Sequence, residues 1–189
     1  MSESSIQEHG SAVRGIVAGA AFTALTAVGA YIAIPIGPVP IVLQNFFVLL
    51  AGLLLGPLRG LASIAVYLLI GAIGLPVFAG GTGGIGHFFG PTGGYLVGFL
   101  PAVYIAGLLS GRGPRTHTAR NLAALAAGAC AVYLVGVPWL KAVTGMTWTS
   151  SLAAGLLPFI PGDVVKVIAA AFTAKNLSPR FDAFFRREE

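Results

Sequence analysis

The sequence predicts an all-α, polytopic membrane protein with six transmembrane helices, and three observations lead to this fold class. Hydrophobic residues make up 56% of the 189 residues and charged residues only 9%, whereas soluble domains carry about 25% charged residues. The apolar residues form runs close to the length of a membrane span, roughly 20 residues. Lysines and arginines lie singly at the ends of these runs. A soluble fold of this size could not bury so much apolar surface.

The apolar runs give the predicted helices in chain order. The first and third end before Pro35 and Pro76, because proline ends a helix at the residue before it. The second is short for a span, so we expect it to be tilted, packed behind other helices or extended by its neighbours. The predicted spans are 13–34, 41–55, 58–75, 93–109, 122–140 and 151–174. They define a membrane domain over 13–174, after a polar N-terminal tail (1–12) and before a basic C-terminal tail (175–189).

The basic residues set the orientation, because Lys and Arg are enriched in cytoplasmic loops. With both termini in the cytoplasm, Lys141 alone lies outside and Lys166 lies within a span. The residues on the cytoplasmic side are then Arg14, Arg59, Arg112, Arg115, Arg120, Lys175, Arg180, Arg186 and Arg187. We therefore predict a multi-pass protein of the cell membrane. Its loops at 35–40, 76–92 and 141–150 face outward.

Several function classes are disfavoured by what the sequence lacks. The net charge is +5, but no basic patch with interleaved aromatics indicates nucleic acid. The single cysteine, Cys130, excludes an internal disulfide and a thiolate metal cluster. His87 is a lone histidine without further metal ligands nearby in the sequence. No hydrolase, metalloprotease or ATP-binding motif is present. We expect no enzyme and no cofactor, so uphill transport would need a partner or an ion gradient.

Asp163 is the only acid in the predicted six-helix domain, and Lys166 follows three residues later. An ionisable residue within a span costs a few kcal/mol and is a functional candidate by default. Residues i and i+3 share a helix face, so the two side chains can pair or point at one ligand. Pro161 and Gly162 precede the acid and predict a broken helix there. Because irregular backbone at membrane depth survives only when buried or lining a cavity, we favour a binding site over mutual neutralisation.

The loop at 76–92 is long, rich in glycine and uncharged. Loops of this length are usually functional or disordered, and glycine lets the backbone approach a ligand closely. The spacing of a phosphate-binding loop with its final Lys-Ser/Thr is absent. A flexible linker is the alternative, but linkers are usually hydrophilic. This loop instead contains Phe78, Phe88 and Phe89, which favours a packed lid.

Other residues have weaker claims to a functional role. Gln44 and Asn45 offer hydrogen-bond donors and acceptors at the outer start of the second span, where capping or interhelical bonding is the plain alternative. Tyr95 adjoins the glycine-rich loop, although an aromatic belt also explains tyrosines near a membrane boundary. Ala20 and Ala24 form a small-xxx-small pair that lets helices approach closely.

Taken together, the motifs resemble the BioY family, the biotin-specific substrate-binding (S) components of energy-coupling factor (ECF) transporters. The resemblance covers nearly the whole chain, and its last two motifs are long and fairly specific. Four segments carry it: Gly-Pro-Val-Pro-Ile-Val-Leu-Gln (37–44), Leu-Ala-Gly-Leu-Leu-Leu-Gly-Pro (50–57), Gly-Leu-Pro-Val-Phe through the glycines to Gly-Pro-Thr-Gly-Gly-Tyr (74–95), and Pro-Phe-Ile-Pro-Gly-Asp-Val-Val-Lys (158–166).

The resemblance implies a six-helix subunit that captures biotin from outside with high affinity. It also implies a transmembrane coupling subunit and two cytoplasmic ATPases as partners, with Ala20 and Ala24 on the docking face. The ligand-contacting residues that it implies are Gly80, Gly81, Thr82, Gly83, Gly84, Tyr95, Asp163 and Lys166. Related members can carry Asn or Arg at positions that correspond here to Thr82 and Leu96, which leaves the partner of the biotin carboxylate open.

The chemistry of biotin suits these residues. Asp163 can accept from a ureido N–H through a charge-assisted bond, and Lys166 can donate to the ureido carbonyl, to the carboxylate or to Asp163. Backbone N–H groups of the glycine-rich loop, or Tyr95, could then meet the carboxylate. Gln44 adds polar capacity, and candidates for an apolar wall are Phe46, Phe78, Phe88 and Phe89.

Three alternatives remain from the residues alone. The same fold could bind another small vitamin, such as thiamine or riboflavin, because a single acid also suits other donors. An enzyme with Asp163 as general base lacks a second carboxylate or metal partner. A structural subunit without any ligand is the third.

Overall fold

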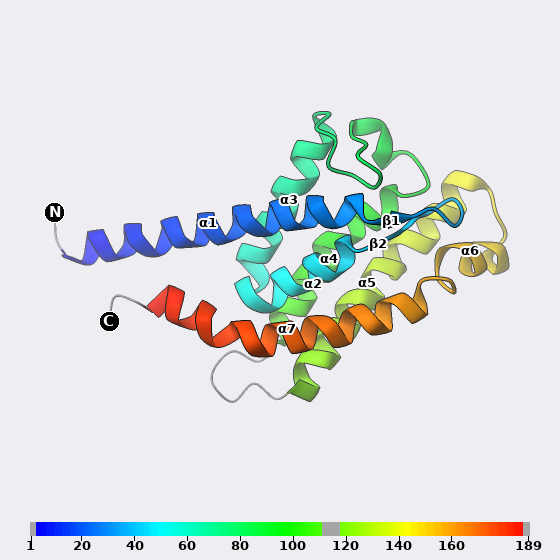
Figure 1. Cartoon of the computed structure of the whole chain (residues 1–189). Coiled ribbons are helices and arrows are strands. Elements are labelled where there is room, and N and C mark those ends of the chain that lie inside the picture. The colour runs from blue at the N-terminus through cyan, green and yellow to red at the C-terminus, as the bar shows by residue number, and fades with distance from the viewer. Residues whose placement is uncertain (1–2, 111–117, 187–189) are drawn as a thin grey trace.

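The protein is described by a computed structural model that covers residues 3–110 and 118–186. It is mainly helical (Figure 1). The helices are α1 (Glu3–Tyr31), α2 (Gln44–Leu55), α3 (Pro57–Ala72), α4 (Gly93–Leu109), α5 (Thr118–Thr144), α6 (Trp148–Gly155) and α7 (Ile160–Arg186). They are joined by a short hairpin of β1 (Ala33–Ile34) and β2 (Ile41–Val42) and by a 3-10 helix, η1 (Ile85–Phe88). Arg112, Arg115 and Arg187, which helped to predict the orientation, lie outside the described residues.

Helix α4 lies at the centre of the molecule, packed against α2, α3 and α5. Its residues Ala102, Val103 and Ala106 are completely buried. The neighbouring helices approach closely because they present glycine to α4. A Cβ at Gly52 would lie 2.5 Å from the carbonyl oxygen of Val103, closer than two such atoms can approach. Small residues therefore set the spacing of the central helices, as is common in membrane proteins.

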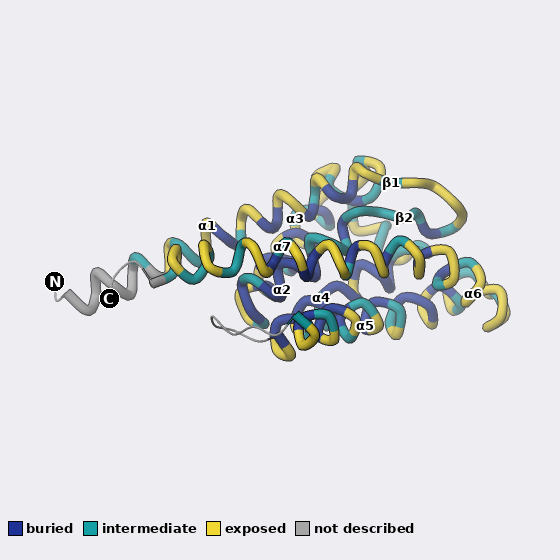
Figure 2. The backbone as a smooth tube through the Cα atoms, turned by 60° about the horizontal axis from the view of Figure 1, so that its bottom comes forward, coloured by how far each residue is buried: buried dark blue, intermediate teal, exposed yellow. Residues whose placement is uncertain are grey.

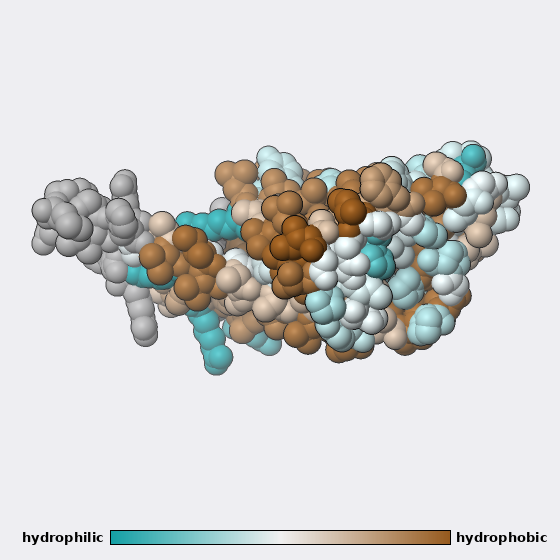
Figure 3. Space-filling model, turned by 90° about the horizontal axis from the view of Figure 1, so that it is seen from above, coloured by the Kyte–Doolittle hydropathy of each residue, from teal (hydrophilic) through white to brown (hydrophobic). Residues whose placement is uncertain are grey.

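The outer surface is apolar along much of the bundle. Exposed large hydrophobic residues include Val17, Leu134 and Phe172, which are 56%, 76% and 60% exposed. Figure 2 shows exposed residues following the outer faces of α1 and α7, and Figure 3 shows hydrophobic atoms across the middle of one face. Such a surface suits a lipid solvent, because exposed apolar patches this large are rare in soluble monomers.

Two described helices are long and apolar enough to cross a membrane, namely α1 over Ala12–Tyr31 and α5. The bent pair of α6 and α7 counts as a third if it forms one span. Helices α2, α3 and α4 are apolar but have only 12, 16 and 17 residues. At 1.5 Å per residue, 12 residues reach only about 18 Å, well short of a hydrocarbon core of about 30 Å. Six spans therefore stay a prediction.

The hairpin between α1 and α2 corrects the predicted ends of the first two spans. Residues 33–34 and 41–42 were expected to be helical, but they form strands that pair Ala33 with Val42 and Ile34 with Ile41. Ile34 precedes Pro35, and a residue before proline is held in extended conformation. The β-branched pair that follows Pro40 favours a strand as well.

The predicted sixth span over 151–174 contains a break, because residues 156–159 separate α6 from α7 and the two helices meet at 46°. A break was expected from Pro161, but Pro161 is the second residue of α7. Proline is well tolerated in the first turn, where its missing N–H has no helical partner to lose. The irregular backbone lies instead around Pro158, and Asp163 lies in the first turn of α7.

Helix α7 also extends beyond residue 174 through most of the segment predicted as a basic tail. Three contacts hold this end against α1 and α3. Arg14 donates from Nη1 to the carbonyl oxygen of Phe184 at 2.9 Å, and the guanidinium of Arg59 lies 4.7 Å from the ring centroid of Phe185. The rings of Phe22 and Phe181 lie 6.1 Å apart. Both termini therefore lie at the same end of the molecule (Figure 1).

Candidate ligand-binding site

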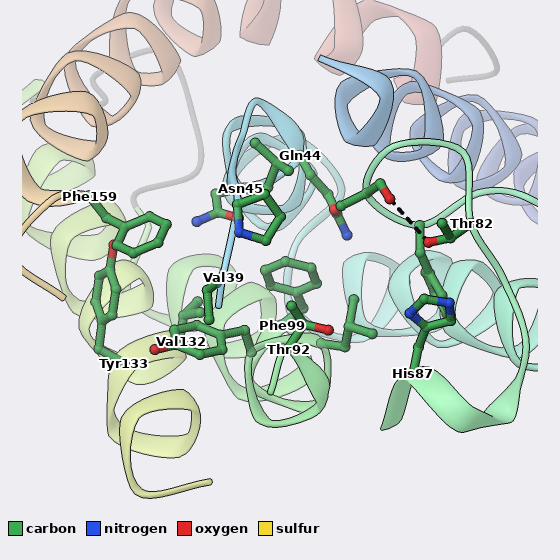
Figure 4. Close-up of a pocket in the computed structure, with 16 residues that line it drawn as sticks. Val39, Gln44, Asn45, Thr82, His87, Thr92, Phe99, Val132, Tyr133 and Phe159 are labelled. Carbon is green, nitrogen blue, oxygen red and sulfur yellow. Dashed lines mark hydrogen bonds between the residues drawn. The ribbon is translucent and has the colours of Figure 1, made fainter. Parts of the chain in front are cut away.

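The structure contains a cavity of about 220 Å³. The β1–β2 hairpin, the glycine-rich loop, η1, the first halves of α2 and α4, the middle of α5 and the break between α6 and α7 surround it (Figure 4). The lining residues are Val39, Pro40, Val42, Gln44, Asn45, Phe78, Ala79, Thr82, His87, Thr92, Tyr95, Leu96, Phe99, Val132, Tyr133 and Phe159. Most of these side chains are apolar or aromatic, with a few polar groups among them, as in small-molecule sites generally.

The apolar walls are held firmly by packing. Phe78, Phe99 and Phe159 are 2%, 3% and 4% exposed. The ring of Phe78 makes edge contacts with Tyr67, His87 and Phe88, with centroids 5.7, 5.7 and 5.8 Å away. Gly71 makes room for the same ring, because a Cβ there would lie 2.2 Å from its Cζ. The wall on this side is therefore already formed.

Asp163 and Lys166 form an ion pair, which is one of the two arrangements that their spacing allows. Lys166 Nζ donates to Asp163 Oδ1 at 2.9 Å, and the two residues are only 9% and 8% exposed. The other carboxylate oxygen, Oδ2, accepts a short hydrogen bond from the hydroxyl of Tyr133 on α5. The N-terminal turn of α7 adds favourable partial positive charge for the carboxylate. Lys166, the Tyr133 hydroxyl and the N-terminal turn of α7 therefore all stabilise the negative charge of Asp163.

Tyr133 connects this pair to the cavity. Neither Asp163 nor Lys166 lines the cavity, but Tyr133 does, and its ring lies beside Phe159 with centroids 6.4 Å apart. The charged residues therefore lie one hydrogen bond behind the wall. A carboxylate has about four lone-pair sites, so the two bonds that Asp163 accepts leave it capacity for a ligand donor.

The other polar residues of the wall are largely fixed by the protein itself. The amide nitrogen of Gln44 donates to the hydroxyl of Tyr67 at 2.7 Å, and that hydroxyl donates to the carbonyl of Val77 at 2.9 Å. Tyr95 donates from its hydroxyl to the carbonyl oxygen of Gly155 at 2.8 Å. Tyr67 thus connects α3 to the loop that follows it, and Tyr95 connects α4 to the end of α6.

Several segments of the glycine-rich loop contact the rest of the molecule. Phe78 and Thr82 form a β-bridge. The N–H groups of Gly80 and Gly84 donate to the carbonyls of Ala30 and Gly71, at 3.2 and 2.7 Å. Gly80, Gly81 and Gly84 have φ values of 71°, 74° and 106°, which side chains rarely adopt. The glycines therefore shape the loop, and its side chains form the wall.

The structure brings together only some of the residues that the sequence singled out. Phe78, Thr82, Gln44 and Tyr95 line the cavity, whereas Asp163 and Lys166 lie behind it. The remaining predicted residues are not part of the lining: Gly80, Gly81, Gly83, Gly84, Phe46, Phe88 and Phe89. Gly83 packs against Leu75, since a Cβ there would lie 2.2 Å from that carbonyl oxygen.

Tyr133 and His87 are among the lining residues that the sequence did not predict. A hydroxyl in the middle of an apolar run needs a buried partner, and this need is the signal for Tyr133. The lone histidine carries no such signal in the sequence. Among the described residues, no group of three or more histidine, cysteine or acidic side chains could hold a metal ion.

The small residues of α1 lie on a second surface. Ala20 and Ala24 are exposed, and Ala20 lines an apolar groove of about 380 Å³ between α1 and α3. Thr23 and Ser63 close the base of this groove, where the Thr23 hydroxyl donates to the Ser63 carbonyl at 2.9 Å. Arg59 lies at its rim.

Comparison with known proteins gives consistent matches along the chain. The probable biotin transporter BioY of Pyrococcus horikoshii is 49% identical over 158 residues, which cover 84% of this chain and 92% of that protein. The biotin transporter BioY of Thermotoga maritima is 41% identical over 165 residues, covering 87% and 96%. The crystal structure of the S-component for biotin from an ECF-type ABC transporter matches with a TM-score of 0.84 and 32% identity, covering 98% of this chain and all of that one.

A family model gives the same assignment independently of any one relative. The model of the BioY family matches residues 2–183. The named relatives are transporters, and the long apolar helices identify this chain as a membrane protein. The chain therefore belongs to the BioY family.

Proposed function

We propose that this protein is the biotin-binding S component of a vitamin uptake transporter, which captures biotin from outside the cell and is a transport subunit, not an enzyme. One observation carries the proposal: a largely apolar cavity ends at Tyr133, which is hydrogen-bonded to a buried ion pair. Biotin offers a matching shape, with an apolar bicyclic body, a ureido ring and a carboxylate tail. The names of the relatives support this choice of ligand.

The ureido ring is assigned to the Tyr133 end of the cavity. One of its N–H groups donates to the Tyr133 oxygen, and Asp163 acts on this bond by accepting the Tyr133 proton. Asp163 and Lys166 thus act on the ligand as substrate-binding residues, with Tyr133 as the group in direct contact. Hydrogen bonds to charged groups contribute about 1.5–3 kcal/mol each, enough to discriminate a ureido ring from an apolar one.

The deciding experiment is a calorimetric titration of the purified full-length chain with biotin in detergent. Saturable heat with one site per chain is expected. Mass spectrometry of the ligand that copurifies identifies any other vitamin. Recovery of thiamine or riboflavin, with no heat from biotin, would keep the transport role and change the ligand.

The partners belong to the same proposal. A transmembrane coupling subunit docks on the exposed small residues Ala20 and Ala24 of α1, and two cytoplasmic ATPases supply the energy. The groove beside Ala20 offers a close-approach surface for a helix. The two termini lie together with the Gly56–Pro57 turn at one end of the molecule (Figure 1), which supports a cytoplasmic end there and outward-facing loops at the other.

A further inference from the structure

The cavity has polar groups at two opposite ends. Tyr133 and Phe159 lie at one side of the cavity, and Thr82 and His87 lie at the other (Figure 4). Phe99 lies between them. An elongated ligand whose ring contacts Tyr133 therefore points its other end toward Thr82 and His87. This step rests on the proposed function, in which the ring end is ureido and the far end is a carboxylate.

A carboxylate in a mostly apolar cavity needs a donor, because an unpaired buried charge is very costly. The nearest charged donor already has a partner within the protein. Lys166 Nζ lies 2.9 Å from Asp163 Oδ1 and does not line the cavity. Within the described chain, no lysine and no arginine lines the cavity.

Several donors of the glycine stretch and of α4 are engaged as well. The N–H groups of Gly80, Gly81, Thr82 and Gly84 all donate to backbone carbonyls. The hydroxyl of Tyr95 donates to Gly155, and the hydroxyl of Thr82 donates to the carbonyl of Ala79 at 3.0 Å. The acidic end must therefore be received by another residue of the wall.

His87 is placed to do this. It lies on η1, half-buried, and its ring makes an edge contact with Phe78 at 5.7 Å between centroids. Neither ring nitrogen makes a hydrogen bond to another described residue. A histidine ring carries at least one N–H donor in either protonation state. Contact with Phe78 orients the ring at the cavity edge without using a nitrogen.

We propose that His87 is a specificity-determining residue that receives the carboxylate of the ligand and makes the site prefer biotin over its neutral amide. Thr92, which also lines the cavity, contributes a second donor through its hydroxyl. The preference arises because a hydrogen bond to a carboxylate is about twice as strong as one to a neutral group.

The test compares biotin with biotinamide on the full-length chain in detergent, by calorimetry. The wild type is expected to bind biotin about 10-fold more tightly than biotinamide, since a bond to a charged group contributes about that much. His87→Phe keeps the ring contact with Phe78 but removes the donor. It should lose most of the preference, to within about twofold, because its affinity for biotin falls more than its affinity for biotinamide. His87→Lys should keep the preference.

Two further variants control the result. Tyr133→Phe alters the opposite end and should weaken both ligands equally, leaving their ratio intact. Phe89→Leu changes an exposed loop residue outside the lining and should change neither affinity. A preference retained in His87→Phe, or lost in Tyr133→Phe, would overturn the assignment of His87. Absence of biotin binding by the wild type would instead overturn the proposed function.

Discussion

The hydroxyl of Tyr133 on α5 donates a hydrogen bond to the carboxylate of Asp163 on α7. The two residues are 30 positions apart in sequence and lie on different helices. Their contact places the end of an apolar cavity next to a buried ion pair. Substitutions of Tyr133 and of Asp163 should therefore affect both stability and ligand binding.

Tyr133→Phe removes one hydroxyl and leaves the ring in place. Asp163 Oδ2 then loses its partner in a buried setting, which costs about 1–3 kcal/mol. We expect a lower melting temperature in detergent and biotin affinity reduced about 10-fold. Calorimetry and a thermal melt measure both. An unchanged biotin affinity would show that the hydroxyl does not contact the ligand.

Asp163→Asn should weaken biotin binding by at least about 1.5 kcal/mol, because a charge-assisted bond becomes a neutral one. It should also destabilise the protein by about 3–5 kcal/mol, since Lys166 is left buried without its counter-charge. The double variant Asp163→Asn/Lys166→Met separates these effects. It should regain most of the stability and none of the affinity, as measured by melting and titration. Recovery of biotin binding in the double variant would contradict a ligand role for Asp163.

Gly155→Ala tests the anchoring of Tyr95. A Cβ at Gly155 would lie 2.3 Å from the Tyr95 hydroxyl oxygen, so the ring must shift and deform the wall that it lines. Overpacking of this kind costs about 1–3 kcal/mol, and both stability and biotin affinity should fall. Gly162→Ala is the matched control. No atom would lie within 4 Å of its Cβ, and alanine is favoured over glycine in a helix. Equal losses in the two variants would argue against the steric cause.

The face of α1 is tested by Ala20→Trp and Ala24→Trp. Both residues are exposed, so the bulky side chains should leave folding and biotin binding unchanged. Close approach of a partner helix requires small residues, so copurification with a coupling subunit and ATPases should be lost. Leu134→Trp on α5, at a position 76% exposed, controls for a lipid-facing tryptophan. Full assembly of the Ala20→Trp and Ala24→Trp proteins would place the docking surface elsewhere.

Much of the helical fold could be predicted because prolines and glycines mark the ends of the apolar runs in the sequence. The helix over 93–109 has the predicted bounds, and the Gly56–Pro57 turn separates α2 from α3 as expected. The β1–β2 hairpin could not be predicted in the same way. Its strands have two residues each, too few to show an alternating pattern, and their pairing depends on contacts between distant segments.

The site was only partly predictable for a related reason. An acid and a lysine inside an apolar run are conspicuous, so Asp163 and Lys166 were found directly. Tyr133 and Phe159 look like ordinary core aromatics in sequence, and only the packing of α5 against the α6–α7 break brings them to the cavity. Sequence alone also did not show that the loop glycines shape the backbone while Phe78 and Thr82 form the wall.

The ion pair at the start of α7 has one further consequence for the transport cycle. Because its two charges cancel and both carboxylate oxygens have protein partners, a vacant subunit carries no bare charge into hydrocarbon. The empty site therefore needs no added proton or counter-ion to balance this pair. In the proposed transport cycle, the work of uphill movement is then left to the partner subunits.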